Sequence, residues 1–406
     1  MNLENLKKYA NIIIDQYQKE FEEISDYIFK NPELGLKEIK SAKYLIEKLK
    51  KYGFSVEENY CGFPTAFRGE FGDNDGSAIC FLAEYDALPG YGKDKNENGH
   101  ACGHNWIAAS TLGAVIALSK LKDKFSGKII LIGTPAEETL GPKVDMVNKK
   151  AFNNIDIVFQ MHLSNKTNIG CRALAIDSFK FEFFGKTAHA SAFPEDGINA
   201  LDSVNLLYSG INCLRQHVKS DVRIHGVIRN GGLAPNTVPD YASCEFMIRS
   251  ETREYLDTVT ERVLNCAKGA AMMTGCKLVY SNVDNSFDNL LNLPALQNLM
   301  EKNLIEAGVK NINRGIEGGA GSSDIGNVSK VIPTMYTEME IESEKNCYVH
   351  NENFLKYVNS DSSNIVLNKA IKAMVNSSLE IYTDKTLLKN IKEEFESLTN
   401  RQKYKN

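Results

Sequence analysis

The chain has 406 residues, of which 43% are hydrophobic and 24% are charged, with 29 glycines and 10 prolines. This composition is typical of a globular protein of two or three domains, and it excludes disordered, collagen-like and low-complexity chains. A net charge of −5 leaves no basic excess for binding nucleic acid or an anionic membrane. The apolar runs are much shorter than the roughly 20 residues of a membrane span, and charges interrupt the N-terminal segment where a signal peptide needs an apolar stretch.

The nine cysteines are scattered and odd in number, so they predict no disulfide framework. A reducing, cytoplasmic compartment fits this usage best. Most of these cysteines are expected to be small buried apolar side chains or surface thiols. Only Cys102 has neighbours that set it apart.

Helices and strands alternate over the first part of the chain. Two amphipathic helices come first, and later short apolar runs are typical of buried parallel strands. Such alternation predicts an α/β domain with a mostly parallel sheet. The predicted helices span 3–29, 38–52 and 107–121, and the predicted strands span 65–70, 77–83, 128–133 and 155–161.

The pattern changes near residue 178, where 178–186 alternates strictly like a half-buried strand. A helix (197–216), two strands (222–228 and 242–250), a helix (253–274) and a strand (277–282) follow, an order that resembles a ferredoxin-like α+β unit. Helix 294–307, a Gly-rich loop, strand 331–338, helix 353–383 and a charged tail complete the chain. We therefore predict an α/β domain formed by 1–177 and 289–406, interrupted by an inserted domain at 178–288.

The segment GHACGHN, which starts at Gly99, holds the densest group of candidate metal ligands. Cys102 and His104 lie two residues apart, and thiolate and neutral imidazole suit zinc and related divalent ions. Flanking glycines let such a loop turn tightly. We predict that Cys102 and His104 bind a metal, with His100 as a weaker candidate.

Further polar side chains follow predicted strands. Glu137 and Glu138 come after strand 128–133, His162 after strand 155–161, and Asp86 after strand 77–83. In open α/β sheets, sites lie beyond the carboxyl ends of the strands. Adjacent carboxylates point in different directions, so one can bind a metal while the other faces a substrate or water. Asp86 is placed to orient a ligand histidine.

These motifs together resemble the co-catalytic metallopeptidase family of aminoacylases, acetylornithine deacetylase and glutamate carboxypeptidase. They are most similar to its amidohydrolase branch, which includes hippurate hydrolase, auxin-conjugate hydrolases and aminobenzoyl-glutamate hydrolase. The matching segments, in chain order, are NPELG, AEYDALPG, GHACGHN, GTPAEE, MH, GKTAHAS, GGLAPNTVPD, GSSDIGNVS and His350. Three departures bear on the substrate more than on the ligands: an insert at 93–98, Thr-Leu-Gly-Pro at 139–142, and Met-Tyr-Thr at 335–337.

The resemblance implies a zinc-peptidase-like catalytic domain and a smaller lid domain that forms a homodimer. It implies two divalent ions per subunit, zinc or manganese, with cobalt or nickel also accepted. Cys102 would bridge the ions, Glu137 would be the general base, and His189 would reach a substrate oxyanion, from the partner subunit. The implied ligands are Cys102, His104, Glu138, His162 and His350, the implied positioning residue is Asp86, and the implied substrate contacts are Asn236, Gly318 and Gly319.

The predicted activity is hydrolysis of the amide bond of an N-acyl or aminobenzoyl amino acid, or of a small dipeptide. A free substrate carboxylate needs a cation or amide donors, for which Arg249 and Asn236 are candidates, although Arg249 also fits a surface salt bridge. Two alternatives stay open. Cys102 is a nucleophile with His104 as its base, or the chain is a metal-binding protein that keeps the fold without catalysis.

Overall fold

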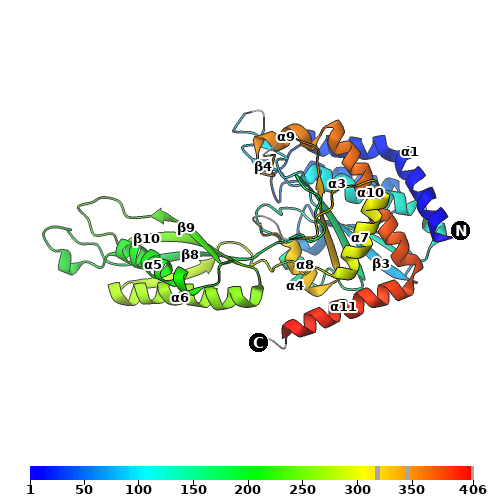
Figure 1. Ribbon diagram of the computed structural model, residues 1–406. Coiled ribbons are helices and arrows are strands. Elements are labelled where there is room, and N and C mark those ends of the chain that lie inside the picture. Colours follow the sequence, from blue (N-terminus) through cyan, green and yellow to red (C-terminus); the bar gives the residue numbers. More distant parts are fainter. Residues whose placement is uncertain (93, 316–320, 344–346, 404–406) are drawn as a thin grey trace. The chain divides into compact units, whose positions relative to one another are not determined.

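The computed structural model describes residues 1–92, 94–315, 321–343 and 347–403. It contains two compact units (Figure 1). Unit 1 is built from Met1–Arg172 and from two later segments that begin at Leu290 and Asn327, and unit 2 from Ala173–Asn289 and a short return segment that ends at Gly326. Within the described ranges, every helix is too short or too polar to cross a membrane.

A six-stranded sheet lies at the centre of unit 1, in the order β1-β2-β6-β3-β7-β12. Strands β6, β3, β7 and β12 are parallel, and β1 and β2 form an antiparallel edge. The central strands are buried on both faces, as parallel strands between layers of helices must be. The sheet confirms the α/β class. The strands are β1 (Ser55–Glu58), β2 (Phe67–Gly72), β3 (Ser77–Ala83), β6 (Gly127–Gly133), β7 (Ile157–Ser164) and β12 (Thr334–Glu340), and β4 (Leu88–Pro89) pairs with β5 (Asn98–Gly99) outside this sheet.

Helix α3 (His104–Ser119) fixes the position of the site. It is buried along nearly its whole length because its side chains are apolar on all sides. It packs against β3, β6 and β7, while α1 (Leu3–Lys30) and α10 (Asp361–Thr383) pack against it (Figure 1). Because α3 connects the parallel strands β3 and β6, its N-terminus lies at the carboxyl ends of the strands. The other helices of this unit include α2 (Ile39–Lys51), α7 (Pro294–Glu306) and α11 (Lys385–Lys403).

The structure corrects several predicted elements. Helix α3 begins at residue 104 and not at 107, so the metal-binding loop runs directly into it. Helices α4 (Lys143–Asn148) and α8 (Ile325–Val331) and strand β1 were not predicted, because each is too short to show a clear period. The predicted helix 353–383 is two helices, α9 (Glu352–Val358) and α10, because Ser360 and Ser363 form a capping box that starts a new helix.

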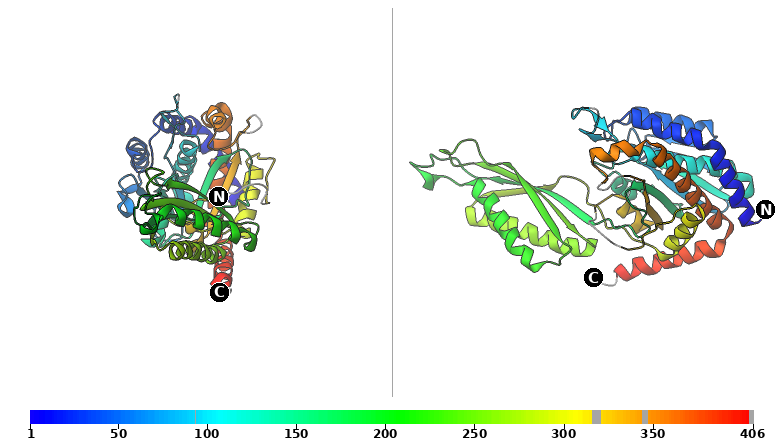
Figure 2. Two further views of the ribbon diagram at one scale, coloured as in Figure 1. Left: turned by 90° about the vertical axis from the view of Figure 1, so that its left-hand side faces the viewer. Right: turned by 45° about the horizontal axis from the view of Figure 1, so that its top comes forward.

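Unit 2 consists of a four-stranded antiparallel sheet with two helices packed on it (Figure 2). The strand order is β11-β8-β10-β9, and the elements follow the predicted sequence β-α-β-β-α-β. Alternate phenylalanines of β8 are buried beneath the helices, which explains the strict alternation of that strand. The elements are β8 (Ala175–Phe184), α5 (Ala200–Leu214), β9 (Arg223–Asn230), β10 (Tyr241–Ser250), α6 (Arg253–Thr274) and β11 (Lys277–Asn282).

Candidate metal centre

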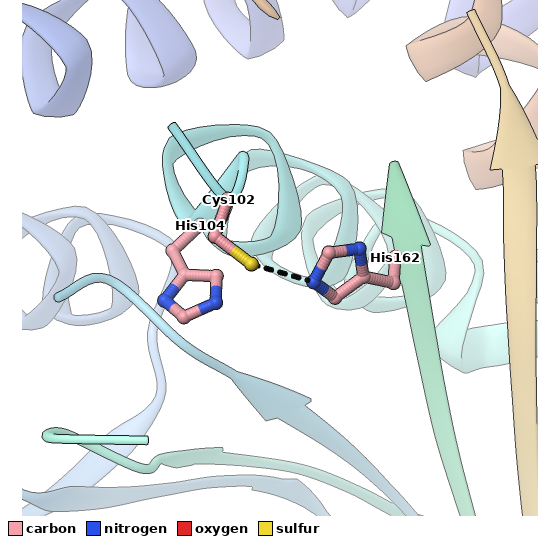
Figure 3. Close-up of side chains that lie close together, drawn as sticks. All are labelled: Cys102, His104 and His162. Atoms are coloured by element: carbon pink, nitrogen blue, oxygen red, sulfur yellow. Dashed lines mark hydrogen bonds between the residues drawn. The ribbon is translucent and has the colours of Figure 1, made fainter. Parts of the chain in front are cut away.

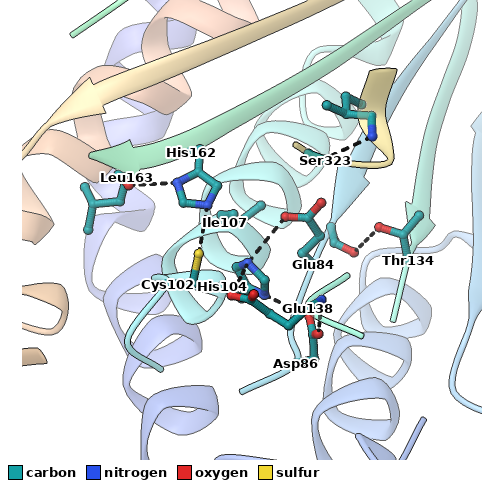
Figure 4. Close-up of polar contacts among 12 residues, drawn as sticks. Glu84, Asp86, Cys102, His104, Ile107, Thr134, Glu138, His162, Leu163 and Ser323 are labelled. Carbon is teal, nitrogen blue, oxygen red and sulfur yellow. Dashed lines mark hydrogen bonds and ion pairs between the residues drawn. The ribbon is translucent and has the colours of Figure 1, made fainter. Parts of the chain in front are cut away.

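Three parallel strands deliver side chains to one place in unit 1. Asp86 lies just beyond β3, Glu138 just beyond β6, and His162 near the end of β7. Figure 4 shows these side chains gathered around His104 at the start of α3. The convergence follows from parallel strands, whose carboxyl ends meet at the same edge of a sheet.

Cys102 faces His162 across a short gap (Figure 3). The Cys102 thiol donates to Nε2 of His162 over 3.4 Å. Nδ1 of His162 donates to the Leu163 carbonyl over 2.7 Å, so the other ring nitrogen presents its lone pair to the thiol. Gly103, between Cys102 and His104, has φ of 86°, a conformation that glycine adopts without strain. The loop therefore turns tightly enough to aim both Cys102 and His104 into the site.

Asp86 orients His104. Its Oδ1 accepts from Nδ1 of His104 over 2.8 Å, and its Oδ2 accepts from the backbone N–H of Glu138 over 3.0 Å. Nδ1 of His104 therefore carries the proton, and Nε2 keeps a lone pair. That Nε2 is buried and makes no hydrogen bond within the described part of the chain. A buried nitrogen left unpaired is costly, and a cation bound there would complete it.

His350 reaches the site from the loop before α9. Its φ of 60° is uncommon for a residue other than glycine. The backbone holds it there, because its N–H donates to the Ala101 carbonyl over 2.8 Å and its own carbonyl accepts from the Tyr91 hydroxyl over 2.8 Å. Its Nε2 lies 3.0 Å from Oε1 of Glu138.

The five candidate ligands form two overlapping sets. Cys102, His104 and His162 offer donor atoms that all lie within 4.8 Å of one another, and so do Cys102, Glu138 and His350. A third set, His104 with Glu137 and Glu138, connects them. Because Cys102 belongs to both of the first two sets, the geometry suits two neighbouring cations that share one thiolate.

The electrostatics of the site favour an added cation. Burial, reinforced by the charge of Glu138, raises the pKa of the Cys102 thiol well above its usual range. Burial and the neighbouring His104 lower the pKa of His162 to about 4, so this ring is neutral at pH 7. Thiolate and neutral imidazole are the forms that bind a metal, and the residues present therefore fit a pair of divalent ions. The raised thiol pKa also disfavours the alternative of a free Cys102 nucleophile.

Two buried charges beside the centre were not predicted. Oε1 of Glu84 lies 2.6 Å from Nζ of Lys143, and Oε2 of Glu84 lies 3.7 Å from Nε2 of His104. Burial acts to raise the pKa of Glu84, but the attraction of Lys143 and His104 outweighs it and lowers that pKa to about 2. Glu84 could have been noticed as a second carboxylate at the end of β3. Lys143 gave no signal, because it begins a helix that the periodicity does not reveal.

His100 joins none of these ligand sets. Its Nε2 lies 3.1 Å from the Ile28 carbonyl, and burial lowers the pKa of the ring to about 3. It is therefore a neutral core histidine, which corrects its candidacy as a ligand.

The remaining candidates lie outside unit 1 or outside the described residues. In unit 2, the N–H of Ala190 donates to the Asn236 carbonyl over 3.0 Å, which places His189 and Asn236 on neighbouring segments. Arg249, on β10, donates to Oγ of Ser322 over 3.1 Å. Gly318 and Gly319 lie outside the described residues. The substrate contacts assigned to these residues stay predictions.

Known proteins resemble this chain over most of its length. The description of peptidase family M20/M25/M40 matches residues 80–365, a span that contains every candidate ligand. Xaa-Arg dipeptidase of Mus musculus is 31% identical over 97% of this chain and 93% of its own length. One of the chains of the p-aminobenzoyl-glutamate hydrolase of Escherichia coli (strain K12) is 30% identical over 77% of this chain and 67% of its own length.

Solved structures share the fold. One from methicillin resistant Staphylococcus aureus superposes with a TM-score of 0.78 and 22% identity, covering 92% of this chain and 100% of that one. A dinuclear metal binding peptidase of Bacillus subtilis superposes with a TM-score of 0.65 and 19% identity, covering 88% of this chain and 98% of that one. At these identities the likeness extends to the fold alone.

Proposed function

Because the chain belongs to peptidase family M20/M25/M40 and is a metal-dependent hydrolase of peptide or amide bonds, we propose a role for each residue of its metal centre. The carrying observation is that Cys102 belongs to two sets of donor atoms, each within 4.8 Å. We assign Cys102, His104, Glu138, His162 and His350 as ligands of two divalent ions. The donor set suits zinc, and centres of this kind also take manganese, cobalt or nickel.

Two divalent ions bound here would lower the pKa of a shared water and polarise the substrate carbonyl. Glu137 is the general base: its carboxylate takes a proton from the attacking water and delivers it to the leaving amine. Asp86 holds the proton of His104 on Nδ1 and keeps Nε2 available as a ligand. Glu138 is fixed through its own N–H, which donates to Asp86. The adjacent carboxylates therefore divide the two roles, Glu138 as ligand and Glu137 as base.

The substrate we propose is an N-acyl amino acid or a small dipeptide. The relatives named above support both classes, since one is a dipeptidase for Xaa-Arg and another a hydrolase of p-aminobenzoyl-glutamate. In unit 2, His189 is exposed and its Nδ1 accepts from the Ala192 N–H over 3.3 Å, which leaves Nε2 as the nitrogen that would donate to a developing oxyanion. Asn236, on the neighbouring segment, is the proposed contact to the substrate.

We further propose that unit 2 is the lid and forms a homodimer, so that His189 acts in the partner's site. A cytoplasmic location is proposed as well, because all nine cysteines are free thiols.

The test is hydrolysis of a substrate panel by protein reconstituted with zinc or manganese. The panel holds aminobenzoyl-glutamate, hippurate, N-acetyl amino acids and dipeptides, including dipeptides with C-terminal arginine. Each reaction runs with and without a chelator, and Glu137→Gln protein is the matched control. Cleavage of one class that the chelator abolishes supports the assignment. No cleavage by protein that carries two ions per chain contradicts it.

A further inference from the structure

The segment Glu33 to Ser41, here called the clamp segment, matches a family motif but has no role in the chemistry above. It contacts one of the loops that carry site residues. The Glu33 carbonyl accepts from the N–H of Ala87 over 2.8 Å, and Leu34 forms a β-bridge with Ala87. Ala87 directly follows Asp86, so the clamp segment fixes the backbone beside the carboxylate that orients His104.

Glu38 connects the clamp segment to the second loop. Its side chain is fully buried, with 0% exposure. Oε1 accepts from the backbone N–H of Ala136 over 2.8 Å, and Oε2 accepts from the Thr65 hydroxyl over 2.9 Å. The start of α2 does not need this carboxylate, because the Glu33 side chain accepts from the N–H groups of Lys40 and Ser41. Glu38 therefore serves the loop after β6.

Ala136 is the residue that needs this support. Its φ of 56° is left-handed, which is disfavoured for alanine because of its Cβ. The turn continues with bonds from the N–H groups of Thr139 and Gly141 to the Ala136 carbonyl, at 3.3 and 3.2 Å. Glu137 follows directly, and beyond it the N–H of Glu138 donates to Asp86. The backbone of Glu137 is thus held by one carboxylate on each side.

Gly35 shows how closely the clamp segment packs on this turn. A Cβ at residue 35 would lie 2.6 Å from Oγ1 of Thr139 and 2.9 Å from Cβ of Ala136. Only glycine permits that approach, and any larger side chain must push the turn away.

We propose that Glu38 is a positioning residue: it holds Ala136 in its left-handed conformation and thereby sets the directions of the Glu137 and Glu138 carboxylates. The inference rests on the proposed function for the roles of Glu137 and Glu138. It assigns to the clamp segment the job of fixing both site loops, one through Ala87 and the other through Ala136. A residue that only stabilised the fold would not discriminate between these loops and the rest of unit 1.

The first test needs no activity and is therefore independent of the proposed function. Hydrogen–deuterium exchange is followed on peptides that span 134–141 in wild-type, Glu38→Gln and Glu38→Leu protein. The glutamine keeps an oxygen acceptor for the Ala136 N–H, whereas leucine removes it. We expect at least tenfold faster exchange in the leucine variant alone, with peptides from α10 unchanged. Equal exchange in the two variants overturns the proposal.

The second test measures kcat and KM on the panel compound that wild-type protein cleaves best, together with metal content and Tm. Glu38→Leu is expected to lower kcat by 10- to 100-fold with KM changed less than threefold, while Glu38→Gln stays within threefold of wild type. Unchanged kcat in Glu38→Leu overturns the proposal, as does an equal loss in both variants.

A second pair of variants keeps the test valid if Glu38→Leu fails to fold. Gly35→Ala leaves Glu38 in place but crowds the turn, and it is expected to lower kcat at least tenfold. The exposed neighbour Lys37→Ala is the matched control and is expected to behave as wild type. Wild-type kcat in Gly35→Ala would show that the position of the turn does not matter, and would overturn the proposal.

Discussion

The two ligand sets of the metal centre share Cys102 but differ in how they are held. His104 and His162 stand on a buried helix and a central strand, and the His104 side chain is only 1% exposed. His350 lies in a loop, with φ of 60° and a side chain that is 46% exposed. The sequence spacing treats all three histidines alike. The structure shows that one cation site is preorganised by the core and the other is completed by a loop, so their affinities should differ.

Removing the shared ligand should have the largest effect. Cys102→Ser is expected to lose both ions and to lower kcat by at least about 1,000-fold, because several kcal/mol of charge stabilisation depend on the metals. Metal content per chain, measured by elemental analysis, checks this, with exposed Cys213→Ser as the control. Full occupancy in Cys102→Ser would show that the thiolate is not a ligand.

Glu137→Gln should separate chemistry from metal binding. Both ligand sets sharing Cys102 stay complete, so metal content should remain at the wild-type value while kcat falls by about 10²- to 10⁴-fold. Steady-state kinetics and metal analysis on the same sample provide the check. If activity survives, Glu137 is not the base.

The difference between the sets predicts the order in which the ions leave. A chelator titration should remove one ion from wild-type protein before the other, and His350→Ala should lower the affinity of that first ion by about 10- to 100-fold. His162→Ala should instead weaken the tightly held ion. If both variants weaken the same ion, the comparison between the two sets fails.

The smallest effect on activity is expected at the buried pair beside His104. Lys143→Met leaves Glu84 buried without its partner, which should lower the free energy of unfolding by about 3–5 kcal/mol. The double variant Glu84→Gln with Lys143→Met should recover most of that loss. Denaturant unfolding measures both. An equal loss in the single and double variants would show that the charge pairing is not what matters.

Much of the centre was predictable because chemistry-bearing residues follow buried strands. Asp86, Glu138 and His162 each come at the end of a parallel strand, and such ends meet at one edge of a sheet. His350 carries no such signal, and only the ordered set of motifs pointed to it. Its place depends on backbone bonds to Ala101 and Tyr91 that no spacing encodes.

The residues missed by sequence reasoning are buried charges. Glu38, Glu84 and Lys143 look like ordinary surface residues, because a charged side chain is usually exposed. Their partners lie in other segments of the chain, and only the folded structure shows that those partners neutralise or bind them. Short helices such as α4 and α8 were missed for a related reason, since packing and not periodicity fixes them.

The position of His350 also affects the chain as a whole. A metal held by both Cys102 and His350 would act as a cross-link that closes a loop of about 250 residues, with the whole of unit 2 inside it. Loading the centre would then restrict the unfolded chain as a long-range staple does, and the metal-loaded protein should tolerate a cut in the exposed segment around Leu233, which is 99% exposed, without losing either fragment.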